Sequence, residues 1–510
     1  MYETEEKNMI DIVHYISNWC PQEGAYENKI VIYDDNWNDY GYRTTFHMVY
    51  FDKKGKIKEI GDIKIYNFNF DEMRNPHYGI NVSIELPENI IQLSEKFCSL
   101  GQNLMFYQNL KRLFPKCYMR ILERLNDMAT NETIRNAYED EHGVQTSLLR
   151  DSSAEKALNE AADLLMNDST KENDISFRYS LEVPYSNLQN ELLFDFKKTQ
   201  DIPFRINALV GKNGTGKTQI LAGLADSLSG LTDTAVKRNA KFVGKRPAID
   251  KVISVSFSAF DAFRKRSESE DKYYYTNSYV YCGIQSVKGT LSLKQLHENF
   301  IASLKKIKEN ERIVAWKDVM SELIEQEHIS MIESILEDGE MDIHFSSGQH
   351  ILICTMTEVL ANIENESLIL FDEPEIHLHP NAIANTMRML YRLLEKFNSY
   401  AIIATHSPLI IQEIPSRYIR VLTRINNVLS IHIPDNECFG ENITKITDDL
   451  FDVQSTESNY KSIFKKMSKK MTYEDILELF EGKLSFNAMV YLKNCCERRE
   501  DNDTTYTDRE

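Results

Sequence analysis

One glycine-rich segment of the chain has the residue types and spacing of a phosphate-binding loop. It fits the pattern G-x-x-x-x-G-K-[ST] without a gap, through Gly211, Lys212, Asn213, Gly214, Thr215, Gly216, Lys217 and Thr218. Glycine lets the backbone N–H groups of such a loop approach phosphate oxygens, and the N-terminus of a following helix adds the positive end of its dipole. We expect Lys217 to reach the β- and γ-phosphates and Thr218 to ligate Mg²⁺. The segment therefore predicts a site for ATP with Mg²⁺.

Three further side chains could complete this site. Asp372 and Glu373 directly follow an apolar run over residues 367–371, which is typical of a buried strand. At the carboxyl end of a parallel strand, Asp372 would hold the water shell of Mg²⁺, and Glu373 could polarise the attacking water as a general base. His406 follows the next apolar run and could donate to the γ-phosphate and sense its loss. A lone histidine after a strand can also be purely structural.

The order of strand-like and helix-like segments predicts an α/β fold. Short apolar runs that alternate with helical patterns indicate a parallel core, whereas residues 28–86 read as a mainly antiparallel β layer and residues from 90 onward as helices. We expect six segments: a β-rich N-terminal part (1–89), a helical insertion (90–175), a phosphate-loop core (176–290), a helical lobe (291–343), a second core segment (344–415), and a β hairpin followed by helices (416–510).

Composition narrows the class of protein. The chain has 510 residues, of which 42% are hydrophobic and 10% aromatic, as in a folded globular protein. Its net charge of −19 excludes non-specific coating of nucleic acid by the whole surface. We find no apolar run long enough for a membrane span, and the acidic N-terminus does not resemble a secretory signal. We therefore expect a cytoplasmic protein, no membrane contact, and reduced cysteines.

A short segment before another helix-like run carries a resemblance to a known superfamily. After Phe345 it reads Ser346, Ser347, Gly348 and Gln349. Together with the phosphate loop, the adjacent carboxylates and the histidine, it resembles the ABC-type ATPases, whose signature loop usually reads Leu-Ser-Gly-Gly-Gln. The resemblance implies that Ser346 and the backbone near Gly348 grip the γ-phosphate of ATP on another subunit. It thus implies a homodimer with two ATP molecules between the subunits, and Ser347, in place of glycine, is expected to loosen closure and slow turnover.

The same resemblance implies an architecture and a branch of the superfamily. The implied fold is a P-loop ATPase head of ABC type, similar to RecF and SMC heads, with an antiparallel β layer, helical insertions and a C-terminal helical extension. The strings FDEPEIHLHP and ATHSP look like those of overcoming-lysogenization-defect (OLD) ATPases. His377 and His379 in the first string could ligate a metal. They lack an evident third ligand, however, and stand where the D-loop of the superfamily packs at the dimer seam.

Further strings are similar to the PtuA family, the ATPases of Septu systems and Septu-type retrons. They are DNWNDYGYRTTF, IGDIKIY, FSAFDAF and FGENITKITDDLF. The resemblance implies an HNH-type nuclease partner of the PtuB kind, in retrons also a reverse transcriptase with its RNA-linked DNA, and DNA or tRNA as the target of the complex. The late Asp501-Asn502-Asp503 lies in a polar tail, so we expect no fused Toprim nuclease. C-terminal lysines are expected to dock the partner or contact nucleic acid, namely Lys465, Lys466, Lys469 and Lys470.

Two alternatives stay open at this point. One is a stand-alone ATP-dependent nuclease similar to anticodon nucleases. Its catalytic group would have to come from the segment after His406, where the candidates are Arg420, Arg424, His432 and Glu437. The other is a DNA-repair ATPase similar to RecF, which shares the ATP site and dimerises on DNA.

Overall fold

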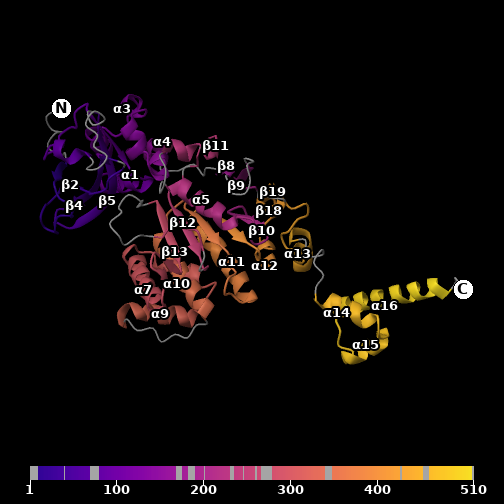
Figure 1. The fold of residues 1–510 in the computed structure, drawn as a ribbon. Coiled ribbons are helices and arrows are strands. Elements are labelled where there is room, and N and C mark those ends of the chain that lie inside the picture. Colours follow the sequence, from indigo (N-terminus) through magenta and orange to yellow (C-terminus); the bar gives the residue numbers. More distant parts are fainter. Residues whose placement is uncertain are drawn as a thin grey trace. The chain divides into compact units, whose positions relative to one another are not determined.

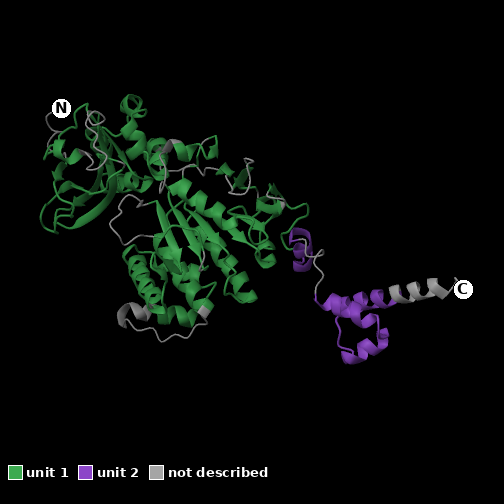
Figure 2. Ribbon diagram, viewed as in Figure 1, with its two compact units in different colours: residues 1–441 green, residues 442–510 purple. Residues whose placement is uncertain are grey.

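The computed structural model consists of two compact units, Met1–Glu441 and Asn442–Glu510 (Figure 2). Within residues 10–507 it describes all but 40, 69–79, 168–174, 182–189, 200, 230–234, 245, 248, 259–260, 266–277, 339–346, 426–427 and 452–458. Across these described ranges, no helix combines the length and the apolar character needed to cross a bilayer.

The first unit is built around a seven-stranded sheet (Figure 1). In spatial order its strands are β13 (Tyr279–Gly283), β12 (Val252–Ser256), β16 (Leu368–Asp372), β17 (Tyr400–Thr405), β10 (Ile206–Gly211), β18 (Ile419–Ile425) and β19 (Val428–His432). All neighbours pair in parallel except the hairpin of β18 and β19. Strands β10, β12, β16 and β17 are buried along their whole length, because both faces of a parallel sheet are covered. The sequence prediction of a parallel α/β core is confirmed.

One face of this sheet shares its core with a helix and a smaller sheet. The helix is α5 (Lys217–Ser229), and the smaller sheet is antiparallel, with the order β11 (Phe242–Val243), β8 (Ser176–Leu181) and β9 (Asn190–Asp195). Phe177 and Phe194 of the smaller sheet pack in one cluster with Leu221 of α5 and Leu370 of β16. Helix α5 is therefore fixed between two sheets, which holds its N-terminus at the end of β10.

A helical lobe precedes the second half of the core. It contains α7 (Leu293–Glu309), α8 (Ile313–Met320), α9 (Gln326–Asp338) and α10 (Ser347–Asn362). Ser292 and Gln295 form a capping box that starts α7. The buried indole of Trp316 donates to Thr357 Oγ1 at 3.0 Å, which ties α8 to α10. The two core strands that follow lead into α11 (Pro380–Lys396) and the short α12 (Pro408–Ile411).

The N-terminal β layer is a second, separate sheet. Its spatial order is β1 (Asp11–Tyr15), β2 (Lys29–Asp34), β4 (Thr45–Phe51), β5 (Ile57–Asn67) and β7 (Phe97–Gly101), and only the pair β1–β2 in it is parallel. Helices pack on it or follow it, namely α1 (Leu104–Leu113), α2 (Tyr118–Arg124), α3 (Glu132–Tyr138), a π-helical turn (Val144–Leu148) and α4 (Ser152–Asn167).

Two segments of this layer differ from the sequence prediction. Strand β7 lies in the range for which helices were expected, because a short, fully buried run such as Phe97–Gly101 has no periodicity that separates strand from helix. The strand expected near residue 80 is reduced to β6 (Ile80–Asn81), which pairs with β3 (Tyr42–Arg43) and is followed by a 3₁₀ turn, Val82–Glu85. Ser83 Oγ donates there to Asp34 Oδ2 at 2.7 Å, so a buried polar contact fixes this segment.

A buried group of charges ties α4 to the core sheet. The ammonium of Lys156, which is 1% exposed, contacts the carboxylate of Glu366 and lies 3.3 Å from Asp250 Oδ2. Asp250 and Glu366 precede β12 and β16, respectively. The group therefore sits at the amino ends of two neighbouring core strands.

The second unit is helical. It contains α13 (Ile443–Phe451), α14 (Asn459–Ser468), α15 (Tyr473–Leu479) and α16 (Phe486–Thr507). Its small core comprises Phe464, Ile476 and Leu492. The sequence prediction ended the last helix near residue 497, whereas α16 continues to Thr507.

Candidate active site

The phosphate loop connects the end of β10 to the start of α5. Gly214 and Gly216 have φ of +82° and +95°, a region that residues with a side chain rarely adopt. A Cβ on Gly211 would lie 2.6 Å from the carbonyl oxygen of Leu422 in β18. The loop geometry thus depends on glycine at three positions of the predicted pattern.

Lys217, in the first turn of α5, points back over this loop. Its ammonium donates to the carbonyl oxygen of Gly211 at 2.9 Å and to that of Lys212 at 3.4 Å. The residue is 5% exposed, and burial lowers the pKa of its ammonium despite the nearby carboxylates, first that of Glu373. A phosphate above the loop would give this buried cation a counter-charge.

The next residue contacts the carboxylate at the end of β16. Thr218 Oγ1 lies 2.9 and 3.1 Å from the two oxygens of Asp372. Burial raises the pKa of Asp372 to about 7, the Thr218 hydroxyl opposes this, and the charge of Glu373 adds to it. Mg²⁺ prefers oxygen ligands, and a carboxylate next to a hydroxyl supplies them. Both predicted Mg²⁺ ligands therefore fit the ion.

Glu373 leaves the strand in an unusual backbone conformation. Its φ is +49°, and its N–H donates to the carbonyl oxygen of Ala404 in β17 at 2.8 Å. Its carboxylate is 23% exposed, and one oxygen lies 3.6 Å from Nδ1 of His406. Positive φ in a non-glycine residue concentrates at functional sites. The side chain is thus accessible to a water molecule and adjacent to the predicted histidine.

A residue to which the sequence analysis gave no role holds that histidine. One carboxylate oxygen of Glu375 accepts from the Thr405 hydroxyl at 2.7 Å and from the His406 backbone N–H at 2.9 Å, and lies 3.2 Å from His406 Nδ1. The Glu375 side chain is 8% exposed, whereas that of His406 is 45% exposed. Glu375 therefore fixes the backbone and ring of an otherwise accessible histidine.

The strand order explains why these residues meet. Strand β17 lies between β10 and β16, with Val210 opposite Thr405 and Asp372 opposite Ala404. The phosphate loop, the carboxylate pair and His406 thus leave the same edge of the sheet from three neighbouring strands. Carboxyl ends of parallel strands are where open α/β sheets bind ligands. The structure brings together the predicted residues of this group.

Asp261, which follows β12, is a further acid near this edge. Its carboxylate accepts from Tyr281 Oη at 2.7 Å and from Lys265 Nζ at 2.5 Å. Its charge contributes to the raised pKa of Asp372, after burial and the charge of Glu373. Nothing in the spacing of this residue distinguishes it, so sequence reasoning missed it.

The predicted signature segment is described only in part. Ser346 lies outside the described residues, and of Ser347 the structure describes only the backbone, at the start of α10. A Cβ added to Gly348 would lie 2.1 Å from the carbonyl oxygen of His377, which has a φ of +66°. Gln349 lies one residue further along α10. The start of this helix is thus in close contact with the segment that follows the carboxylates.

One of the two histidines of that segment has a structural role. The ring of His379 accepts from the backbone N–H of Asn381 at 3.4 Å and caps α11. Within the described ranges, no group of three or more His, Cys, Asp or Glu side chains is arranged to hold a metal ion. The geometry thus favours a helix cap at His379.

Two of the four residues considered for a cryptic nuclease form hydrogen bonds with the backbone around the hairpin. Arg420 is buried in β18 and donates to the carbonyl oxygens of Arg417 and Ile419. Glu437 accepts from the backbone N–H groups of Ser416 and Phe439, at 2.8 and 3.0 Å. Both side chains stabilise the backbone around the hairpin.

Comparison with known proteins gives a family match and one long relative. Residues 293–412 match the family described as "AAA domain, putative AbiEii toxin, Type IV TA system", a range that includes Asp372, Glu373 and His406. Protein ea59 of Escherichia phage lambda is 27% identical over 512 residues, covering 93% of this chain and 96% of its own length.

Two solved structures are also similar in part. A metal-chelate type ABC transporter in an inward-facing conformation aligns with 51% of this chain and 84% of its own, with 16% identity and a TM-score of 0.29. The protein cbiO1 from Clostridium perfringens, part of the ABC transporter complex cbiONQ, aligns with 61% of this chain and 99% of its own, with 12% identity and a TM-score of 0.29. The phosphate loop, the carboxylates and the histidine have the arrangement of a P-loop ATPase site, and residues 293–412, which include two of these three parts, are similar to the AAA family.

Proposed function

We propose that the protein is the ATP-binding and ATP-hydrolysing subunit of an anti-phage defence complex, that it dimerises through its ATP sites, and that it controls a separate HNH-type nuclease. The observation that carries the enzymatic part is the convergence of Lys217, Thr218, Asp372, Glu373 and His406 at one sheet edge. The resemblance to PtuA proteins motivates the nuclease partner.

Hydrolysis follows from the positions of these residues. Lys217 neutralises charge on the β- and γ-phosphates, and Thr218 and Asp372 would hold a Mg²⁺ ion, which would supply further positive charge at these phosphates. Glu373 accepts a proton from the water that attacks the γ-phosphorus, while the bond to the bridging oxygen breaks and ADP leaves with the electron pair. His406, oriented by Glu375, donates to the γ-phosphate. Because the signature segment carries Ser347 in place of glycine, turnover is slow.

The dimer forms when the start of α10 binds the γ-phosphate of ATP held by a second copy. The N-terminus of a 16-residue helix supplies backbone N–H groups and a positive dipole end for this contact. Gly348 lies against the carbonyl of His377, so the helix start and the loop after the carboxylates contribute to the same surface.

The second unit is the proposed docking module for the nuclease. It carries Lys465 and Lys466 on α14 together with exposed apolar side chains. Phe486 is 75% exposed and Leu479 60% exposed, in a unit whose core contains three buried residues. Exposed apolar patches are typical of protein-binding surfaces. In a retron, the same assembly would include the reverse transcriptase and its RNA-linked DNA, and DNA or tRNA would be the target.

The comparisons support a role in conflict between phages and their hosts. The AAA-family description names a toxin of a toxin–antitoxin system, and the long relative comes from a phage. These descriptions concern the similar proteins. They agree with the resemblance of the sequence to defence ATPases.

A substitution at the general base tests the enzymatic part. Glu373→Gln should retain ATP binding, reduce hydrolysis about a hundredfold or more, and trap a dimer, because the trapped nucleotide holds the subunits together. Phosphate release and light scattering after size exclusion measure both effects. Glu298→Gln, on an exposed face of α7, is the matched control. Normal turnover by Glu373→Gln contradicts the assigned role.

A native pull-down tests the partner. The tagged protein, purified from its own host at low salt, should retain an HNH-type protein in stoichiometric yield. A reverse transcriptase with RNA-linked DNA in the same eluate would identify a retron. Recovery of a bare homodimer contradicts the nuclease partner and leaves the ATPase assignment standing.

A further inference from the structure

The lysine segment, residues 461–470, covers most of helix α14 and the turn that follows it. It contains five lysines, and residues 459–473 contain no aspartate or glutamate, in a chain whose net charge is −19. The five are Lys461, Lys465, Lys466, Lys469 and Lys470. The segment is therefore a local concentration of positive charge in an acidic protein.

The fold of the second unit places most of this charge in solvent. Phe464 and Ser468 are buried and mark the inward face of α14. Lys466 is two residues from both, a spacing that puts it on the opposite face of the helix. Four of the lysines are exposed, namely Lys465, Lys466, Lys469 and Lys470. They form one cationic surface at the end of α14.

These lysines are spaced so that they repel one another. Lys461, Lys465 and Lys469 follow each other at intervals of four residues, and so do Lys466 and Lys470. Like charges four residues apart on a helix are neighbours and destabilise it. The negative end of the helix dipole favours cations in the last turn, but this effect falls off within one turn and does not account for a run of five. The spacing is therefore unfavourable for the isolated helix.

Three of the exposed lysines have no carboxylate to offset this repulsion. Among the described residues, Lys466, Lys469 and Lys470 form no ion pair. The ion pairs described for the second unit, Lys483 with Glu481 and Lys493 with Glu497, lie outside the segment. The charge of these three lysines is thus available to another molecule.

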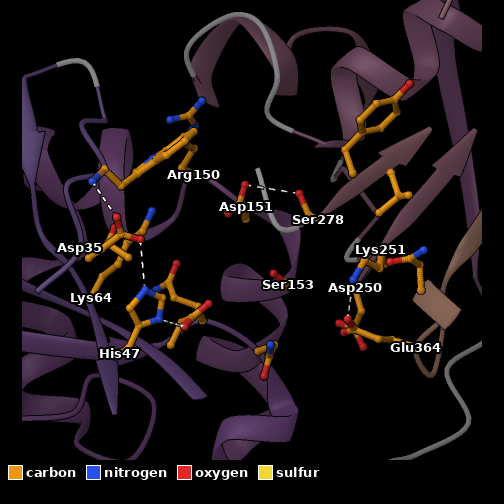
Figure 3. A pocket seen from close by; sticks show the side chains of 18 of the residues that line it. Asp35, His47, Lys64, Arg150, Asp151, Ser153, Asp250, Lys251, Ser278 and Glu364 are labelled. Atoms are coloured by element: carbon orange, nitrogen blue, oxygen red, sulfur yellow. Dashed lines mark hydrogen bonds and ion pairs between the residues drawn. The ribbon is translucent and has the colours of Figure 1, made fainter. Parts of the chain in front are cut away.

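The polar cavity of the first unit shows the opposite arrangement of cations (Figure 3). Both acidic and basic side chains line it. Lys64 Nζ donates to Asp39 Oδ2 at 2.7 Å, and Lys251 Nζ donates to Glu364 Oε1 at 2.6 Å. These cations are neutralised within the fold, whereas those of the lysine segment are not.

We propose that the exposed lysines of this segment bind the phosphate backbone of a nucleic acid. An ammonium group is a compact charge on a flexible stem, which suits phosphates that approach without one fixed geometry. Residues 459–473 contain no arginine, the residue that favours paired, planar contacts with the carboxylates of an acidic protein. Contacts to the backbone carry no sequence information, so the segment holds the nucleic acid and does not select its sequence.

This inference rests on the proposed function, in which the complex acts on DNA or tRNA, and it names the surface that holds this target. The same unit is the proposed docking module for the nuclease, and exposed apolar side chains such as Phe486 are the part of it that contacts protein. Nucleic acid bound to the lysine segment is thereby kept close to the nuclease.

Fluorescence anisotropy tests the proposal on the full-length protein, purified free of nucleic acid and measured without ATP. The probes are labelled single-stranded DNA, duplex DNA and tRNA. The triple variant Lys466→Gln, Lys469→Gln, Lys470→Gln should bind the probe preferred by the parent protein about tenfold or more weakly. The slope of log affinity against log salt should become shallower by about 2 for a single strand and about 3 for a duplex, because three phosphate contacts are lost.

A matched control removes the same charge elsewhere. Lys294→Gln, Lys305→Gln, Lys308→Gln changes three exposed positions of α7 and should leave both affinity and salt slope unchanged. Arginine at the three positions of the lysine segment retains the charge and should retain binding. The glutamine variant should melt no lower than the parent protein, since its repulsion is relieved, so weaker binding does not reflect lost folding.

Three results would overturn the proposal. One is the absence of binding to all three probes at micromolar protein and low salt. Another is an equal loss of affinity in the α7 variant, which would assign binding to net charge. The third is unchanged probe binding by the glutamine variant together with loss of a co-purifying acidic protein, which would assign the segment to a protein partner. ATP turnover of the same samples reports on the proposed ATPase separately.

Discussion

An aspartate is buried at each edge of the core sheet, but the two carboxyl groups have different partners. Asp372 ends β16 at the carboxyl edge, and Asp250 precedes the neighbouring β12 at the amino edge. Burial raises the pKa of each carboxyl to about 7. Asp250 has a permanent cation in Lys156, whereas Asp372 contacts only a hydroxyl of Thr218 among hydrogen-bonding side chains described. A buried carboxyl group thus forms an ion pair within the fold at the amino edge, whereas at the carboxyl edge it is available to bind a ligand.

The largest expected effect comes from removing the permanent cation. Lys156→Met leaves Asp250 and Glu366 buried without compensation and should destabilise the first unit by about 3–5 kcal/mol. Urea unfolding at neutral pH measures this. Lys305→Met, at an exposed position of α7, is the control and should change stability by less than about 0.5 kcal/mol. A similar small effect for Lys156→Met would mean that the amino edge does not depend on this lysine.

The corresponding lysine at the carboxyl edge should behave in the opposite way. Lys217→Ala should weaken ATP binding about a hundredfold, or about 2.7 kcal/mol, because the cation that contacts the phosphates is lost. Stability without nucleotide should not fall, since burial disfavours the charge of this lysine and its described partners are loop carbonyls. Titration with a fluorescent ATP analogue and a parallel urea melt separate the two quantities. Lower stability without nucleotide would remove the contrast between the edges.

A smaller effect is expected from the carboxylate that positions His406. Glu375→Ala should lower kcat about tenfold and leave KM nearly unchanged, because the ring and backbone of His406 lose their common acceptor. Glu375→Gln retains an oxygen in the same place and should recover most of the activity. Steady-state kinetics of both variants decides the matter. Equal loss in both would mean that negative charge at this position, and not orientation, is what matters.

The smallest effect is a pH dependence. In the folded, metal-free protein the carboxyl group of Asp372 stays protonated up to about pH 7, whereas in the unfolded chain it is deprotonated above about pH 4. The free energy of unfolding should therefore fall as the pH rises from about 4 to about 7. Asp372→Asn should remove the contribution of Asp372 to this slope, leave that of Asp250, and raise stability near pH 8 by on the order of 1 kcal/mol. Melting temperatures across this range, with and without MgATP, measure it. MgATP should stabilise the parent protein and not the variant.

The same slope should be present for Asp250 without any response to Mg²⁺. If MgATP stabilised Asp372→Asn as much as it stabilises the parent protein, Asp372 would not be the magnesium ligand.

Much of the ATP site could be predicted because its motifs are local strings. The pattern that ends in Lys217 and Thr218 needs neighbouring residues only, and a buried strand before Asp372 places the carboxylate at a sheet edge. Glu375 stands in a quoted string, yet its role depends on contacts with Thr405 and His406, thirty residues away. Such a contact has no signal in spacing.

The amino edge could not be predicted for the same reason. A polar cavity in the first unit is lined by side chains as distant in the sequence as Gln102 and Glu364, and Lys156 of α4 contacts Glu366, which precedes β16. The prediction for strand β7 was wrong for a different reason. Its five residues are all buried, so the sequence shows no periodicity that would distinguish a strand from a helix. Long-range burial, and not local pattern, determines both features.

The contact between Gly348 and His377 gives a reason for glycine at position 348 that does not involve ATP. A side chain there would collide with a carbonyl of its own chain, 2.1 Å from the Cβ, before any second subunit arrived. The fold therefore excludes larger residues from position 348 even in a protein that never binds a neighbour's nucleotide. A glycine in this segment is a sign of tight packing inside one subunit. It cannot serve alone as a marker of phosphate recognition between two.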